Sequence, residues 1–122
     1  MARLLQPQEI EVFYIIPTLK RYLTIYFKKT GLKQNKIAEL LQIEGATVSQ
    51  YLNEKRGFKI RFGSEVIKEI ENSSILIYDK ISLLREMQRL IKIIRENGTL
   101  CEIHKRFSDI PKDCNLNVVN CM

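Results

Sequence analysis

The 122-residue sequence lacks the long hydrophobic run that a membrane-spanning helix needs. No apolar stretch approaches the roughly 18 residues required to cross a bilayer. The first residues, MARLLQPQEIEVF, also lack the uninterrupted apolar centre of a secretory signal. We therefore expect a cytoplasmic protein with no membrane among its partners. Cysteine is scarce too, and three residues, an odd number, do not suggest a disulfide framework in a reducing compartment.

Residues that carry catalysis are equally sparse. The sequence has one histidine, no glycine-rich loop of the kind that holds a phosphate, and no context for a serine or cysteine nucleophile. We therefore expect the protein not to be an enzyme. Its length suffices for one domain with a modest core and an extra interaction element. A content of 45% hydrophobic and 28% charged residues is that of a globular protein.

Positive charge, in contrast, is present in excess. Lysine and arginine number 20 against 14 aspartate and glutamate residues, which gives a net charge of +6. This sign favours an anionic polymer as partner, although many basic proteins never bind nucleic acid. The positions are more informative, because two basic clusters flank one segment, where the phosphates of a bound nucleic acid would lie. They consist of Lys28, Lys29, Lys33 and Lys36 on one side and of Lys55, Arg56, Lys59 and Arg61 on the other.

The flanked segment, residues 34–56, has the apolar spacing of two short helices joined by a tight turn. Residues three and four apart are neighbours on a helix, so a stripe at this spacing marks the buried face. The apolar residues of the segment are Ile37, Ala38, Leu41, Ile43, Val48, Tyr51 and Leu52. The outer face of the second helix carries short neutral side chains with cations behind them. Such a helix suits the major groove of DNA, where amides and hydroxyls read base edges.

These residues resemble the helix-turn-helix regulators of the lambda-repressor, Cro and Xre kind. IAELLQI, residues 37–43, is similar to the first helix and turn of the family's motif, and TVSQYLNEKRG, residues 47–57, is similar to its recognition helix and exit. The resemblance implies an all-α fold. In it, residues 1–72 form a helix-turn-helix DNA-binding domain, and residues 73–122 add a long C-terminal helix and a short cysteine-containing tail.

The turn departs from the family's pattern at two positions. Gln42 stands where the family usually has a glycine, and a left-handed backbone at a residue other than glycine costs roughly 1 kcal/mol. Glu44 would repel a phosphate near the groove unless it caps the second helix or accepts from a cytosine amine. We expect it to be the cap.

The residues expected to contact DNA lie at the start of the first motif helix and along the second. They are Gln34, Gly45, Ala46, Thr47, Ser49, Gln50, Tyr51, Asn53, Lys55 and Arg56. Gln50 is the best candidate for a bidentate contact to adenine, while Thr47 and Ser49 can read a base edge or a thymine methyl group. Gly45 and Ala46 allow the backbone to approach the groove closely.

The remaining members of this set are expected to hold the phosphate backbone. The resemblance implies that Gln34 grips a phosphate and braces the recognition helix. The hydroxyl of Tyr51 can also reach a phosphate, and Asn53, Lys55 and Arg56 would clamp the strand beyond it. For any one of the polar residues, plain exposure to solvent stays an alternative.

Outside the motif, residues 8–30 predict a long helix, with Gly31 as its C-terminal stop. Pro17 either kinks this helix or starts a second one, and the sequence leaves both open. After the motif, residues 57–63 alternate apolar and basic residues. We interpret them as an extended linker rather than a strand, since one short strand has no evident partner.

Ser64 is then expected to cap a short helix, residues 72–74 to break it, and residues 75–97 to form one long helix ending at Gly98. The apolar residues of this long helix are Leu76, Ile77, Ile81, Leu83, Leu84, Met87, Leu90, Ile91 and Ile94. This stripe is too wide to face water, so either the motif domain or a second copy of the chain must cover it. We favour a homodimer formed through this helix.

The end of the chain gathers the only histidine and all three cysteines: Cys101, His104, Cys114 and Cys121. A Cys3His set can close a tetrahedral zinc site, and an iron–sulfur cluster is chemically possible as well. The resemblance implies that archaeal members of the family can carry a cysteine-rich tail with paired C-x2-C spacing. This chain departs from that pattern, because its upstream stretch at residues 87–90 has no cysteine. Thiols without any ligand role are the alternative.

Together these features predict a sequence-specific transcriptional regulator that binds double-stranded DNA as a homodimer. The helix around residues 45–56 would read the major groove. Two alternatives stay open. One is a chromatin-like binder that holds DNA through charge without reading its sequence. The other is a protein-interaction module, such as an antitoxin or adaptor, in which the long helix binds a partner protein.

Overall fold

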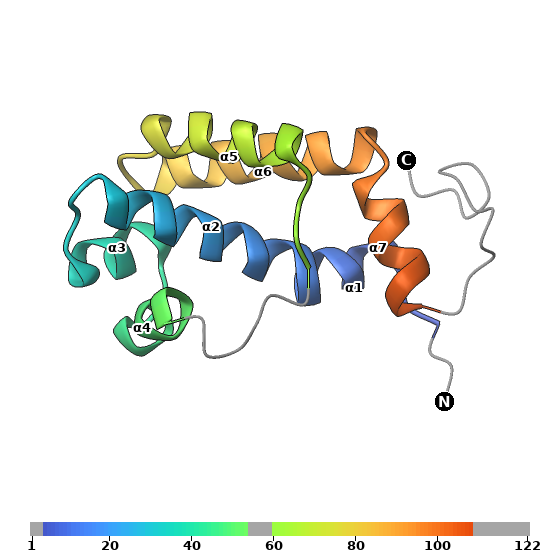
Figure 1. Cartoon of the computed structure of the whole chain (residues 1–122), viewed down its shortest axis with the longest axis horizontal. Coiled ribbons are helices and arrows are strands. Elements are labelled where there is room, and N and C mark those ends of the chain that lie inside the picture. Colours follow the sequence, from blue (N-terminus) through green and yellow to red (C-terminus); the bar gives the residue numbers. More distant parts are fainter. Residues whose placement is uncertain (1–3, 54–59, 109–122) are drawn as a thin grey trace.

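The computed structural model describes residues 4–53 and 60–108, and every regular element in these two stretches is helical. The all-α prediction is confirmed for this part of the chain. The elements are α1 (Pro7–Ile10), the π-helical segment η1 (Glu11–Ile15), α2 (Ile16–Lys29), α3 (Gln34–Leu41), α4 (Gly45–Asn53), α5 (Ser64–Leu76), α6 (Lys80–Glu96) and α7 (Thr99–Phe107). Figure 1 shows α5 and α6 running along α2, with α3 and α4 at one end and α7 at the other. None of the described helices is long and apolar enough to cross a membrane.

Residues 7–29 form a continuous helical rod whose hydrogen-bond pattern changes on the way. The N–H of Ile16 donates to the carbonyl of Glu11, five residues earlier, which is the π-helical pattern. Pro17 follows and has no N–H to donate. The backbone of Ile16 is helical, with φ −60° and ψ −47°, so the rod runs through the proline. The rod ends where the sequence predicts, at Gly31, whose φ of 94° is left-handed.

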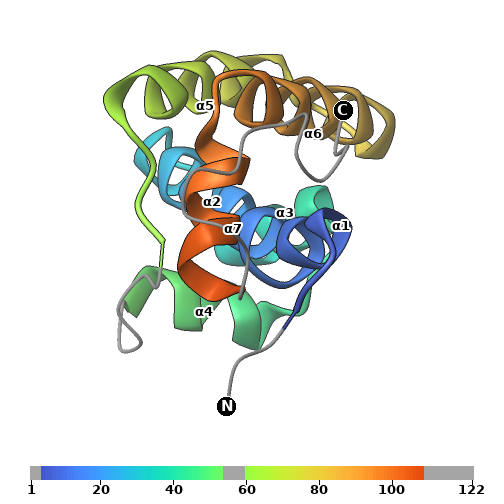
Figure 2. The ribbon, with the colours of Figure 1, turned by 90° about the vertical axis from the view of Figure 1, so that its right-hand side faces the viewer.

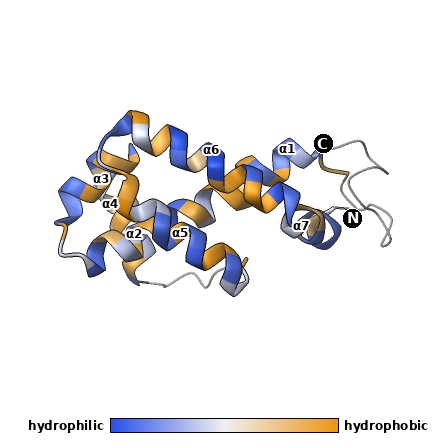
Figure 3. Cartoon of the chain, turned by 90° about the horizontal axis from the view of Figure 1, so that it is seen from above, coloured by the Kyte–Doolittle hydropathy of each residue, from blue (hydrophilic) through white to orange (hydrophobic). Residues whose placement is uncertain are grey.

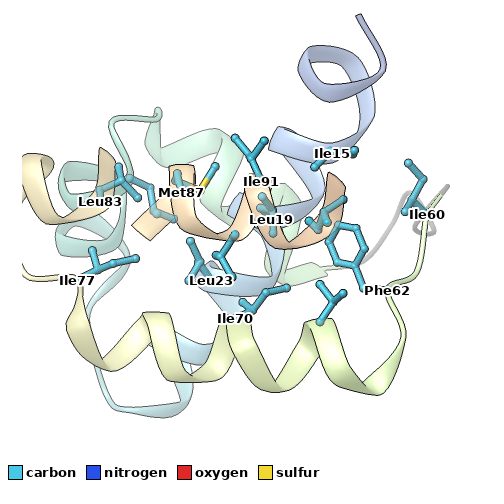
Figure 4. Close-up of a cluster of buried hydrophobic side chains, with 14 of the residues drawn as sticks. Ile15, Leu19, Leu23, Ile60, Phe62, Ile70, Ile77, Leu83, Met87 and Ile91 are labelled. Carbon is cyan, nitrogen blue, oxygen red and sulfur yellow. The ribbon is translucent and has the colours of Figure 1, made fainter. Parts of the chain in front are cut away.

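The core lies between α2, α5 and α6. Leu19 and Leu23 of α2 face Ile70 of α5 and Met87 of α6 (Figure 4), and all four are buried. Fully burying a side chain of this size stabilises the fold by about 1.5–3 kcal/mol. Figure 3 shows apolar residues, in orange, mixed with polar ones along α5 and α6, as expected of helices that bury one face.

The residues just before α5 are anchored by alternate side chains. Ile60 and Phe62 are 2% and 5% exposed, while Arg61 between them faces outward. The ring of Phe62 stacks on Tyr22 of α2, with centroids 5.6 Å apart. Residues 60–63 form neither helix nor strand, so the linker prediction is confirmed for them. Residues 57–59 lie outside the described ranges.

Two predictions about α5 are wrong. Gly63, not Ser64, occupies the N-cap position, and Ser64 is the first residue of the helix. The expected break at residues 72–74 is absent, because α5 continues to Leu76. Ser73 is fully buried, and its hydroxyl donates to Glu86 Oε1 at 2.9 Å. A partner on another helix therefore replaces the turn that a serine favours locally. The predicted domain boundary after residue 72 falls inside this helix.

The long helix predicted for residues 75–97 is wrong at its start and right at its end. Ile77 is extended, with φ −91° and ψ 118°, and ends α5. Asp79 then caps α6: its Oδ1 accepts from the Ser82 N–H at 2.8 Å, and its own N–H donates to Ser82 Oγ at 3.0 Å. At the other end, Gly98 has a left-handed φ of 88° and closes the helix as expected.

Helix α7 was not predicted from the sequence. Figure 2 shows α7 crossing beside α1 at the end of the molecule that faces the viewer. Two hydrogen bonds join α7 to the start of the described chain. Leu5 N–H donates to Ser108 Oγ at 2.8 Å, and His104 Nε2 lies 2.6 Å from the Leu5 carbonyl oxygen. Tyr14 and Phe107 stack nearby, with ring centroids 4.3 Å apart.

Candidate nucleic-acid interface

Helices α3 and α4 form the compact pair that the apolar spacing predicts. Ile37 and Leu41 of α3 and Val48 of α4 are fully buried, and Ile43 and Leu52 are half-buried against the same core. Both helices pack on α2, which carries them at one end of the rod (Figure 1). The outer face of α4 is therefore fixed relative to the rest of the molecule.

The turn between the helices has the left-handed backbone expected at Gln42, with φ 56° and ψ 43°. The Ile43 N–H donates to the carbonyl of Ala38 at 3.0 Å, and this bond closes the end of α3. The side chain of Gln42 also contributes, because its Nε2 donates to the Glu39 carbonyl at 2.7 Å. Such a hydrogen bond is worth about 0.5–1.5 kcal/mol, which offsets the cost of about 1 kcal/mol for the left-handed residue.

Glu44 stands at the start of α4 in the position of a cap. Its backbone carbonyl accepts the N–H groups of Thr47 at 3.0 Å and Val48 at 3.2 Å. Glu44 is exposed, and a carboxylate next to the first turn of a helix interacts favourably with the helix dipole. Capping of α4 by the Glu44 carboxylate itself stays a prediction.

A side-chain hydrogen bond connects the two helices on their outer surface. The hydroxyl of Ser49 donates to Gln34 Oε1 at 3.2 Å, joining the first residue of α3 to the middle of α4. The structure thus brings together two of the predicted contact residues. The carbonyl oxygen of Gln34 is used in this bond, and its NH2 group retains the donors that a phosphate oxygen accepts.

The predicted contact residues divide by exposure. Gln34, Gly45, Ala46, Gln50 and Asn53 are exposed, whereas Thr47, Ser49 and Tyr51 are half-buried. Lys55 and Arg56 lie outside the described ranges. Of the basic clusters, Lys28, Lys29, Lys33 and Lys36 are all exposed, at the end of α2 and the start of α3.

A buried cation on α2, Arg21, acts on Tyr51 in a way that the sequence did not reveal. Burial raises the pKa of Tyr51, and the charge of Arg21 on α2 opposes that rise. Arg21 is only 8% exposed, so a cation is buried beneath α4. It lies off the apolar stripe of α2, and helical periodicity gives no signal for it. Tyr51 is thereby held between the core and the outer surface, as its position predicts.

The predicted metal ligands are only partly described. Cys101 and His104 lie one turn apart on α7, but His104 is buried, and its Nε2 is engaged by the Leu5 carbonyl. Within residues 4–53 and 60–108, no three histidine, cysteine or acidic side chains come together as a metal site would require. Cys114 and Cys121 fall outside these ranges, so the zinc or iron–sulfur site stays a prediction.

Comparison of the chain with protein-family models, curated proteins and solved structures gave no match.

Proposed function

We propose that the protein is a sequence-specific transcriptional regulator of the helix-turn-helix, lambda-repressor-like kind, and that it reads double-stranded DNA with α4. Helix α4 would enter the major groove, with Gln50 as the main base reader. Thr47 and Ser49 would contribute base contacts, and Gly45 and Ala46 would permit close approach.

The observation that carries this proposal is the hydrogen bond between Ser49 and Gln34. It joins α4 to the start of α3 on the outer surface, while the buried Val48 holds the opposite side of α4 in the core. Gln50 and Asn53 are left exposed on the outside. A pre-positioned polar face reads bases at a lower entropic cost than a mobile one.

The charges around this face supply a grip on the backbone. Lys33 precedes α3, and Lys36 lies in its first turn, beside Gln34. The N-terminal N–H groups of a helix and nearby lysines together attract a phosphate. Contacts of this kind set the register of the protein on the duplex, and the base contacts then select the sequence.

Selection of bound sites from random double-stranded DNA with the purified full chain tests the proposal. We expect recovery of a defined sequence motif. Recovery of unrelated sequences with retained affinity would favour a chromatin-like binder and contradict sequence-specific reading. Failure to retain any DNA at low salt would contradict DNA binding itself and favour the protein-interaction alternative.

A further inference from the structure

The end of the hairpin formed by α5 and α6 exposes a group of large apolar side chains. We call it the hairpin patch. Its members are Ile75 (78% exposed), Leu76 (50%), Tyr78 (70%), Ile81 (62%) and Leu84 (59%). They lie at the end of α5, in the connecting turn and in the first turns of α6, at the end of the molecule that carries α3 (Figure 1).

The rotation of α6 that exposes the patch is held by polar anchors. Ser82 and Glu86 are 1% and 4% exposed, while their apolar neighbours Ile81 and Leu84 face outward. The carboxylate of Glu86 accepts from Ser73 of α5 at 2.9 Å and from Arg89 Nε at 3.0 Å. These anchors hold Ile81 and Leu84 on the outer side of α6 while Leu83, Leu90 and Ile94 fill the core.

The size of the patch suits a protein interface. Its five side chains leave on the order of 600 Å² accessible, and apolar patches of this size mark interaction sites. A standard interface buries about 800 Å² on each partner, so the patch with its rim is large enough for a stable contact.

The charges at the rim favour a second copy of this chain as the occupant. Among the exposed residues close in sequence to the patch are two acids, Glu71 and Asp79, and two bases, Lys80 and Arg85. Two chains of net charge +6 repel each other unless they meet at a locally neutral surface. A twofold axis places a residue that lies off the axis opposite a different residue of the partner copy, so acids and bases can pair across it.

We infer that two copies of the chain pair through the hairpin patch about a twofold axis. The pairing deepens the proposed function, because it would present two copies of α4 to two half-sites on one DNA, about 34 Å apart. The sequence predicts a homodimer formed through the long helix, and this inference places the dimer interface at one end of the α5–α6 hairpin. The inner face of α6, including Leu83, Leu90 and Ile94, is buried within the chain itself.

Sedimentation equilibrium of the purified full chain without DNA tests the inference. We expect the unmodified chain to dimerise, and the double variant Ile81→Lys, Leu84→Lys to raise the dimer Kd at least about 10-fold. Both side chains are more than half exposed, so the helical circular dichroism signal should be unchanged.

A matched control uses exposed apolar residues elsewhere on the molecule. Val12 and Phe13 are 57% and 54% exposed on η1, and Val12→Lys, Phe13→Lys should leave the dimer intact. A monomeric unmodified chain overturns the inference. A dimer that survives the Ile81 and Leu84 substitutions overturns it too. Sedimentation is measured without DNA, so its result does not depend on the proposed function. If the chain is a monomer in this test but still selects a defined motif from random DNA, the pairing fails and the proposed function stands.

Discussion

Arg95 near the end of α6 donates from Nη2 to both carboxylate oxygens of Glu11, at 3.0 and 2.8 Å. Glu11 is the first residue of the π-helical segment and is only 7% exposed. The pair ties the beginning of the chain to the helix that carries the hairpin patch. Because the carboxylate is buried, the interaction is less screened than a surface ion pair.

Removing one partner of this pair should be costly. We expect Glu11→Ala to lower the free energy of unfolding by about 1–2 kcal/mol, since Arg95, whose side chain is 37% exposed, loses its carboxylate partner but keeps access to water. Urea denaturation measures the change. The control is Glu96→Ala, whose partner Lys92 is 3.9 Å away on an exposed surface. It should alter stability by less than about 0.5 kcal/mol. Equal effects of the two substitutions would contradict the role given to Glu11.

Gln50 should determine sequence preference. Because it is exposed on the outer face of α4, Gln50→Ala should weaken binding to the selected site by about 1–3 kcal/mol and leave random DNA nearly unaffected. Titration of both DNAs by fluorescence anisotropy compares the two losses. Gln88→Ala, an exposed glutamine on α6, should change neither. Equal losses on the two DNAs for Gln50→Ala would remove Gln50 from the base readers.

Lys36 should act on every DNA sequence alike. It is exposed in the first turn of α3, where a phosphate is expected. Lys36→Ala should therefore weaken binding to all DNA sequences and reduce the magnitude of the slope of log K against log salt by about 1. The same titrations at several salt concentrations give the slope. Lys92→Ala, on the exposed side of α6, should preserve it. An unchanged slope for Lys36→Ala would show that Lys36 meets no phosphate.

Glu86 should make stability depend on pH. Its burial raises the pKa, but hydrogen bonds from Arg89, Ser73 and Arg85 outweigh burial and hold the pKa below its ordinary value of 4.5. A carboxyl whose pKa is depressed by folding stabilises the protein above its unfolded pKa, and this stability is lost as the pH falls through the folded value.

The variant Glu86→Gln isolates this effect. It should be less stable than the unmodified chain at pH 7, and the difference should shrink as the pH is lowered below about 4.5. Urea denaturation at several pH values measures both quantities. A difference that stays constant across this range would show that the charge of Glu86 contributes nothing to stability.

Gln42 should be replaceable by glycine but not by alanine. Gln42→Ala keeps the left-handed strain and removes the bond to the Glu39 carbonyl, so it should destabilise the chain by about 1 kcal/mol. Gln42→Gly loses the same bond but relieves the strain, and its stability should stay within about 0.5 kcal/mol of the original. Denaturation midpoints of the two variants give the comparison. A glycine variant as unstable as the alanine variant would show that the backbone is unstrained.

The parts of the fold that the sequence predicted are those specified by local spacing. Ile37, Leu41 and Val48 lie within one short segment, so their periodicity was enough to place α3, the turn and α4. The junction of α5 and α6 could not be found in this way. Ser73 resembles a helix breaker, yet its partner Glu86 lies on the next helix, and a local pattern does not report such a contact.

In the candidate site, too, local spacing predicted some features, and others depend on contacts between helices. The exposed face of α4 came from its spacing, while the buried charge of Arg21 beneath Tyr51 depends on how α2 and α4 pack. At the other end, Cys101 and His104 suggested metal ligands because of their chemistry. These residues instead belong to the amphipathic helix α7, which the sequence analysis missed. The ring of His104 lies against the backbone carbonyl of Leu5, 99 positions earlier in the chain.

The bonds between Leu5 and α7 also bear on the order of folding. Leu5 and Ser108 are separated by 103 positions, so their contact closes nearly the whole described chain. Closing so long a loop carries a large entropic cost before any contact compensates for it. During synthesis, moreover, Leu5 emerges long before α7 exists. Leu5 and α7 should therefore meet last, after the α2–α5–α6 core has formed, and the helix that holds the only histidine depends on a core already in place.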